Sequence, residues 1–151
     1  MEITTALLAE AAELDSEEQL NIFGVLRSIE APTIPHYQPL LSLVLTLRFS
    51  HGEKGAAKEI ALHIVNEDGR ELVPLLGHKV EIPTDMTGLE METDRIMDLM
   101  GLTFPDYGVY YFDLLINGDT RRQLKLGVFP PGLWKEYHEQ VDHNYPFSHP
   151  A

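Results

Sequence analysis

The sequence predicts a mostly β fold, an antiparallel two-sheet β-sandwich of the Ig-like or C2-like kind, from three observations. Apolar and polar residues alternate in several short runs, as in residues 41–48 and 59–65. Turn residues separate these runs, and Asn117-Gly118 between two alternating segments is the strongest short-range signal for a hairpin. Strands do not alternate with helices, which argues against a parallel α/β sheet.

The first segment, residues 3–29, fits two structures. Leu7, Leu8 and Ala11 are spaced so that they would share one face of a helix. Alternate residues from Ile3 to Ala11 would instead share one face of a strand. A polar stretch at 15–18 separates this run from a second apolar run at 20–25, so we expect two antiparallel strands joined by a turn.

The later elements follow from alternation and from turn residues. In order, we expect a proline-rich crossing loop at 31–39, a strand at 41–48, a mobile connection at 51–55, a strand at 59–65, a turn at Asp68-Gly69 that returns through 71–73, a strand rather than a helical turn at 96–100, and a hairpin of 109–116 with 123–128. Together these segments form a sandwich domain over residues 1–129. A proline-, aromatic- and histidine-containing tail, with a short helix or irregular structure, follows at 130–151.

Composition excludes several classes of function. The chain has 151 residues, enough for one domain, and no cysteine, which removes disulfides, thiolate metal sites and cysteine nucleophiles. Its formal charge of −13 repels phosphate backbones and anionic membranes. No apolar run approaches the about 18 residues that span a bilayer, and no secretory signal opens the chain. We therefore expect a cytoplasmic protein that binds neither nucleic acid nor membrane.

Several segments resemble an uncharacterised bacterial β-sandwich family, a domain of unknown function, over roughly residues 3–128. The resemblance rests on residues 5–12, 20–24, 66–69 and 108–118, which are turn and core patterns. It implies the sandwich fold and a bacterial origin, and it implies no activity, cofactor or catalytic residue.

Residues that would carry chemistry do not form a diagnostic pattern, so we assign no catalytic, cofactor-binding or metal-binding residue. His138, His143 and His149 have neither helical-pair nor compact zinc spacing. The turns at 66–69 and 117–119 carry oxygen ligands but lack the carboxylate density of an EF-hand, and calcium binding there stays open. Asp94 and Asp98 would face one another only on a helix, and the motifs of common hydrolases are missing.

The tail is the segment that the sandwich explains least. A short helix there would place Trp134, Tyr137 and Val141 on one face, at i, i+3 and i+7. Either this face packs on the chain's own sheet, or it contacts a partner protein or a second copy. We expect a non-enzymatic interaction or assembly module that acts through this tail. The alternative is a small-ligand or carbohydrate-binding sandwich, and an enzyme using carboxylates is less favoured.

Overall fold

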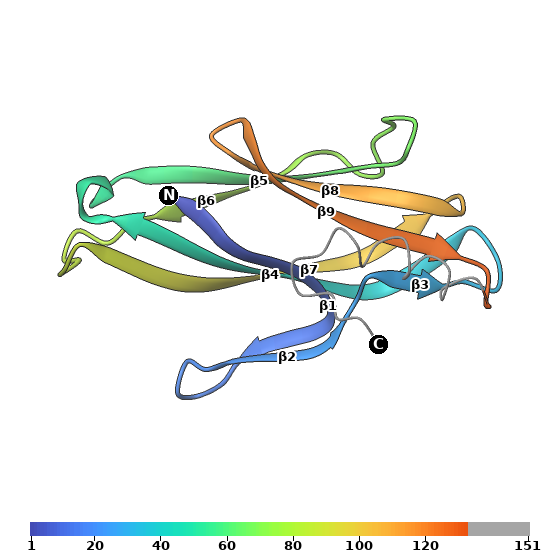
Figure 1. Ribbon diagram of the computed structural model, residues 1–151, viewed down its shortest axis with the longest axis horizontal. Helices are drawn as coiled ribbons and strands as arrows, with labels where there is room; N and C mark the ends of the chain where they lie inside the picture. The colour runs from blue at the N-terminus through green and yellow to red at the C-terminus, as the bar shows by residue number, and fades with distance from the viewer. Residues whose placement is uncertain (133–151) are drawn as a thin grey trace, which may run out of the picture.

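A computed structural model describes residues 1–132 of the chain as two β-sheets packed face to face (Figure 1). The elements are β1 (Glu2–Leu14), β2 (Leu20–Val25), β3 (Ser28–Glu30), β4 (His36–Ser50), the 3-10 helix η1 (His51–Glu53), β5 (Ala57–Val65), β6 (Leu76–Glu81), β7 (Glu90–Phe104), β8 (Gly108–Ile116) and β9 (Asp119–Phe129). One sheet has the strand order β2-β1-β4-β7 and the other has the order β3-β9-β8-β5-β6.

The predicted all-β sandwich is confirmed. Residues 3–29 form the two expected antiparallel strands and then the short β3, and the Asn117-Gly118 turn joins β8 to β9 as predicted. Residues 96–100 lie within strand β7. One pairing in the described part of the chain departs from the antiparallel rule, because β3 runs parallel to β9. Within residues 1–132, no helix has the length and apolarity needed to cross a membrane.

Three segments differ in detail from the prediction. Strand β4 already starts at His36, inside the proline-rich segment, and its Pro39 is tolerated because β1 pairs with β4 only from Ser42 onward. The turn at Asp68-Gly69 returns the chain as predicted, with an antiparallel bridge from Glu71 to Val65 and a hydrogen bond from the Leu72 N–H to the Ile64 carbonyl over 2.8 Å. The return is short, however, and the strand that pairs along β5 is β6. The connection expected at 51–55 contains the 3-10 helix η1 at residues 51–53, where Ser50 and Glu53 make a capping box.

The core consists of alternate residues from the inner faces of the two sheets. Leu41, Leu43, Leu45 and Leu47 of β4 are fully buried, and they face Tyr110, Phe112, Leu114 and Ile116 of β8 across the sandwich. The rings of Phe104 in β7 and Tyr110 in β8 meet edge to face, with centroids 4.9 Å apart and planes at 70°. This contact joins the two sheets near one end of the molecule.

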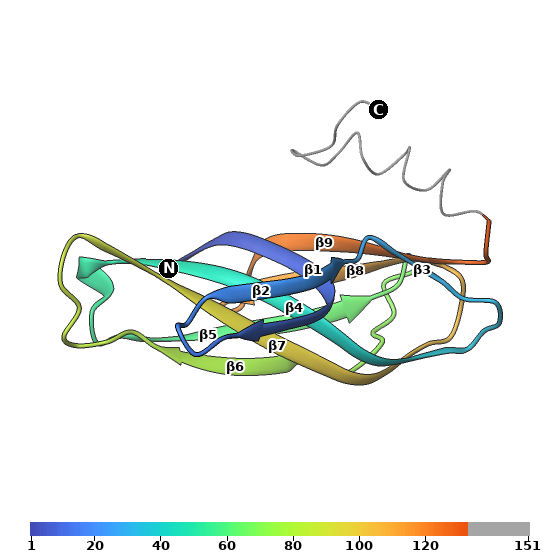
Figure 2. The same cartoon turned by 90° about the horizontal axis from the view of Figure 1, so that it is seen from below.

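The outer face of the first sheet is also partly buried, which alternation does not predict. Ser42 and Val44 pair with outward-facing residues of β1 and β7, yet both are fully buried. Figure 1 shows the end of β1 and β2 folded back beneath this sheet, and in Figure 2 the same hairpin lies in front of β4 and β7. The first sheet is therefore covered on both faces along part of its length.

Candidate functional site

The most distinctive surface of the molecule is the β1–β2 hairpin, residues 9–25. Strand β1 pairs with β4 as far as Ala9 and with β2 from Ala9 onward, so three strands meet at this one buried residue. Beyond it the hairpin leaves the plane of the sheet (Figure 1). Gly24 supports this change of direction, because its φ of +66° is strained for other residues and a Cβ there would lie 2.7 Å from Oε2 of Glu10.

The tip of the hairpin is a tightly hydrogen-bonded turn. The backbone N–H of Asp15 donates to the Gln19 carbonyl over 2.9 Å, and the Asp15 carbonyl accepts from the Glu18 N–H over 3.0 Å. Glu18 has a φ of +60°, which makes this a type I turn followed by a bulge. Oδ1 of Asp15 also accepts from the N–H groups of Glu17 and Gln19, at 2.8 and 2.9 Å. The turn is therefore preorganised by its own backbone.

The pKa of Asp15 reflects this arrangement. The hydrogen bond from the Gln19 backbone, followed by weaker ones from Glu17 and Asn21, lowers the pKa of the Asp15 carboxyl below its ordinary value of 3.8. Partial desolvation opposes this effect without cancelling it. The carboxylate is thus ionised at neutral pH and fixed as an acceptor for its own turn.

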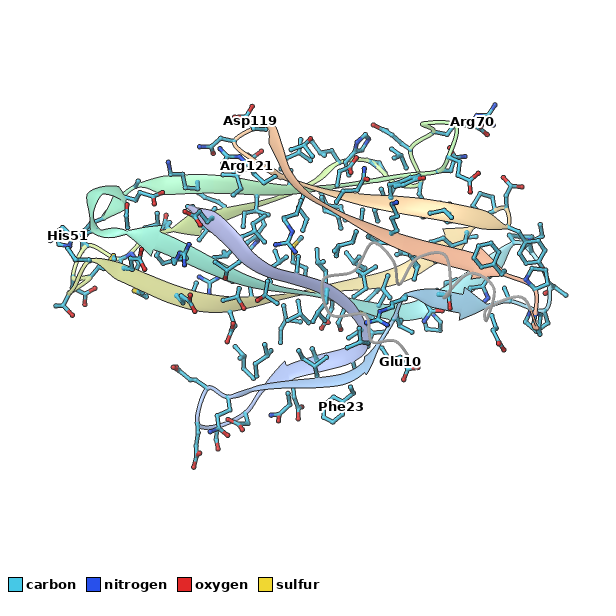
Figure 3. All side chains as sticks on the ribbon, viewed as in Figure 1. Glu10, Phe23, His51, Arg70, Asp119 and Arg121 are labelled. Carbon is cyan, nitrogen blue, oxygen red and sulfur yellow. The ribbon has the colours of Figure 1, made fainter. Side chains whose placement is uncertain are left out.

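Large apolar side chains are exposed along this hairpin. The exposed fractions are 46% for Leu14, 37% for Ile22, 52% for Phe23 and 54% for Val25. Figure 3 shows Phe23 on the side of β2 that is turned away from the rest of the sandwich. The register places Leu14 and Ile22 on one face of the hairpin and Phe23 and Val25 on the other. A folded chain gains free energy by burying such side chains, so their exposure together on one hairpin is typical of a contact surface.

The same hairpin is strongly acidic. Residues 9–25 contain Glu10, Glu13, Asp15, Glu17 and Glu18, and they contain no Lys, Arg or His. The next basic residue along the chain is Arg27. Every charged side chain of the hairpin is therefore negative, which favours a positively charged partner over a neutral or acidic one.

Elsewhere among residues 1–132, two small cavities are candidate ligand sites. One, of about 170 Å³, lies at the open side of the sandwich between β6 and β7, with Arg95 and His78 among its lining residues. The other, of about 150 Å³, lies between the turn at 66–68 and the start of β8. Both are smaller than the roughly 300–1,000 Å³ of typical ligand pockets.

The polar groups of the second cavity are occupied by backbone contacts. The Tyr110 hydroxyl donates to the Asp106 carbonyl over 2.8 Å and accepts from the Asp106 N–H over 3.2 Å. Burial raises the pKa of Tyr110, although the Asp106 hydrogen bond opposes the shift, so the hydroxyl stays protonated. Oε1 of Glu67 accepts from the Val109 N–H over 2.7 Å. These groups hold the loop in place.

The turns at 66–69 and 117–119, which carry oxygen ligands, lie at opposite ends of one sheet. In Figure 3, Arg70 follows the first turn and Asp119 belongs to the second. Oδ1 of Asn66 accepts from the backbone of Asp68 and Arg70, and Oδ1 of Asn117 accepts from that of Glu59, all at 2.9 Å. Within residues 1–132, no three His, Cys, Asp or Glu side chains are grouped to hold a metal ion. These turns therefore cannot act together on one ion.

The remaining candidate residues either make hydrogen bonds within the sandwich or lie outside the described part of the chain. Asp98 and Asp94 lie on a strand, and each accepts a hydrogen bond from β4, from the hydroxyls of Ser42 at 2.7 Å and Thr46 at 2.8 Å. Tyr107, which lines the second cavity, donates to the Ala31 carbonyl over 2.8 Å. The proposed tail contacts lie outside the described residues, as do the tail histidines: Trp134, Tyr137, Val141, His138, His143 and His149.

Sequence reasoning missed the hairpin surface, although it predicted both strands. The available signal was the run Leu20-Asn21-Ile22-Phe23-Gly24-Val25, which has apolar residues at neighbouring positions and therefore on both faces of its strand. Five nearby carboxylates with no basic residue among them were a second signal.

Comparison with known proteins places the chain in a family. Residues 4–129 match the model described as "Family of unknown function (DUF6941)". The search of curated proteins found no match.

Among solved structures, similar chains include a beta-glucuronidase from glycoside hydrolase family 2, with 16% identity and a TM-score of 0.37 over 60% of this chain and 10% of that one. Another is a glycosyl hydrolase family 2 member from Bacteroides cellulosilyticus DSM 14838, with 10% identity and a TM-score of 0.36 over 59% of this chain and 13% of that one. The chain thus spans about a tenth of the length of these structures.

Proposed function

The chain belongs to the family of unknown function DUF6941, and we propose that it is a protein-interaction module whose contact surface is the β1–β2 hairpin. The observation that carries this proposal is the exposure of Leu14, Ile22, Phe23 and Val25 on one preorganised hairpin. The partner surface it fits is apolar at its centre and rich in Lys and Arg around it, because the hairpin is acidic and lacks basic residues.

Phe23 is the expected anchor of the contact. Aromatic side chains at the centre of an interface contribute most per residue, typically about 2 kcal/mol or more, or about thirtyfold in affinity. We expect the double variant Phe23→Ser, Val25→Ser to lose at least that factor in binding while its melting temperature stays close to that of the unmodified chain. Both side chains are already half exposed, so folding gains little from them.

A photocrosslinking experiment tests the surface while the identity of the partner is still open. The chain carrying Phe23→benzoylphenylalanine is irradiated in an extract of its own cells, beside Leu89→benzoylphenylalanine, a matched control at a residue 84% exposed. A discrete adduct at position 23 alone, abolished by Val25→Ser, is the expected result. Equal adducts at both positions, or none at either, would contradict the proposal, and an adduct of twice the chain's mass would identify a second copy instead.

The C-terminal tail is proposed as an additional contact, through Trp134, Tyr137 and Val141. We expect a truncation ending at Phe129 to lose self-association or partner binding without unfolding, because the match to the family ends there. Light scattering behind a sizing column compares its mass with that of the full chain. Equal masses and equal partner binding would remove the tail from the interface.

A small-ligand or carbohydrate-binding role has weaker support. The cavities of about 170 and 150 Å³ are small, and the tyrosine and carboxylate groups beside the second one already bind backbone atoms. The interaction module is therefore the function to pursue first.

A further inference from the structure

The edges of the two sheets are protected to different degrees. Sheet edges expose unpaired N–H and C=O groups, and proteins usually block them with charged side chains, prolines, inward-facing charges or very short strands. In the described part of the chain, the edge strands are β2 and β7 in one sheet and β3 and β6 in the other.

Three of these edges carry a blocking feature. Strand β7 has Arg95 opposite the core residue Leu45, so its side chain lies on the inner face and lines the open side of the sandwich. Strand β6 exposes Lys79 and Glu81, which form an ion pair at 3.4 Å. Strand β3 has three residues, and Pro32 follows shortly after it. These features discourage the addition of a further strand.

Strand β2 has none of these four features. Its one irregularity is Gly24, which has a φ of +66°. Its six residues include no charged residue and no proline, and among the described strands it pairs with β1 alone. It also carries the exposed Ile22, Phe23 and Val25. The least protected edge of the molecule, within residues 1–132, therefore coincides with its apolar surface.

The turn determines which backbone groups face the open edge. Asp15 and Gln19 are a hydrogen-bonded pair, and hydrogen-bonded and non-hydrogen-bonded pairs alternate along an antiparallel ladder. The register pairs Leu14 with Leu20, Glu13 with Asn21 and Ala12 with Ile22. Asn21 therefore exchanges its hydrogen bonds with β1, whereas Leu20 and Ile22 direct their N–H and C=O groups away from β1.

The negative charge of the hairpin indicates which kind of segment binds this edge of β2. A second copy would bring two sets of five carboxylates together, which repels. Residues 133–151 contain Lys135 as their one Lys or Arg, against Glu136, Glu139 and Asp142, so they do not offer the complementary charge either. A foreign segment with Lys or Arg among apolar residues satisfies both the carboxylates and the apolar side chains.

We propose that β2 accepts an extended partner segment, apolar with interspersed Lys or Arg, as an added strand along its free edge. This inference rests on the proposed function and specifies how the hairpin binds. Backbone hydrogen bonds to Leu20 and Ile22 hold the segment, and the hairpin carboxylates contact its basic side chains.

The test uses the full chain and a ten-residue peptide that alternates Ile and Lys, followed by fluorescence anisotropy and by amide hydrogen exchange. We expect the peptide to bind, more weakly as salt rises, and to slow exchange of the Leu20 and Ile22 amides at least tenfold. Ile22→Pro, which removes an edge N–H, is expected to weaken binding at least tenfold, whereas Ile22→Val, which keeps both the N–H and an apolar β-branched side chain, keeps it within a few fold. A peptide N-methylated at alternate residues has the same charge and is expected not to bind.

The outcomes separate the two proposals. In one outcome, the peptide binds and the double variant Phe23→Ser, Val25→Ser abolishes binding, but hydrogen exchange of the Leu20 and Ile22 amides does not change. This outcome would overturn strand addition and keep the hairpin as the contact surface. Binding that is insensitive to every hairpin variant, or no binding at all, would overturn the strand-addition proposal, and the crosslinking experiment at position 23 then decides the proposed function by itself. In another outcome, the Leu20 and Ile22 amides exchange slowly in the full chain without peptide, and truncation at Phe129 makes them exchange fast. This outcome would also overturn the strand-addition proposal, and it would assign the edge of β2 to the chain's own tail.

Discussion

Replacing Phe104 by alanine is expected to lower the free energy of unfolding by about 3–5 kcal/mol, the range for removing a buried aromatic ring. Phe104 is fully buried at the end of β7, and its ring meets Tyr110 of the opposite sheet at 4.9 Å and stacks on His36 at 6.5 Å. The variant loses buried apolar area, and it also loses the contact that joins the two sheets. Urea unfolding followed by far-UV circular dichroism measures the change.

The matched control for this variant is Leu89→Ala. Leu89 is 84% exposed, so its removal is expected to change the free energy of unfolding by less than about 0.5 kcal/mol. A loss of under about 1 kcal/mol for Phe104→Ala would show that this end of the sandwich is not packed as described.

Replacing Val44 by aspartate is expected to cost about 3 kcal/mol or more, because it buries a charge without a partner. Val44 lies on the outer face of β4, between Leu7 of β1 and Ile96 of β7, and it is fully buried. The introduced carboxyl is expected to have a raised pKa in the folded state. Protonation therefore favours folding of the variant, and its deficit relative to the unmodified chain shrinks as the pH falls from the raised folded-state pKa towards the ordinary carboxyl pKa of about 4.

Met100→Asp is the control for the Val44 variant. Met100 lies on β7 of the same sheet and is 78% exposed, so a charge there stays hydrated and is expected to cost little. The urea-unfolding free energies of both variants are compared at about pH 7 and about pH 3.5, on either side of the ordinary carboxyl pKa. Equal costs for both at neutral pH would mean that the hairpin does not cover the outer face of β4.

Local patterns predicted the elements whose partners are near in sequence. The β8–β9 hairpin follows from Asn117-Gly118 and the flanking alternation. The errors occur where pairing is distant. Whether His36 belongs to a strand depends on Phe104, and whether residues 71–73 or β6 pair with β5 depends on the length of the loop between them.

The candidate site was predicted in part. The strands of the hairpin were predicted, but their exposure was not, because residues 20–25 are apolar enough to fill a core. Sequence reasoning placed the contact at Trp134, Tyr137 and Val141, where isolated aromatic residues follow prolines. The hairpin was passed over because the burial of a strand depends on neighbours that its own residues do not specify.

The sequence by itself determined the class of the fold, the cysteine-free acidic character, and the positions of the main turns, because alternation, charge and turn chemistry act over a few residues. Only the tertiary structure decided that β1 leaves its sheet after Ala9, that Val44 is buried on the outer face of β4 while Phe23 is exposed, and that β2 is an edge strand among residues 1–132. These features depend on which strands meet in space, and side-chain periodicity is the same for a strand at the centre of a sheet and for one at its edge.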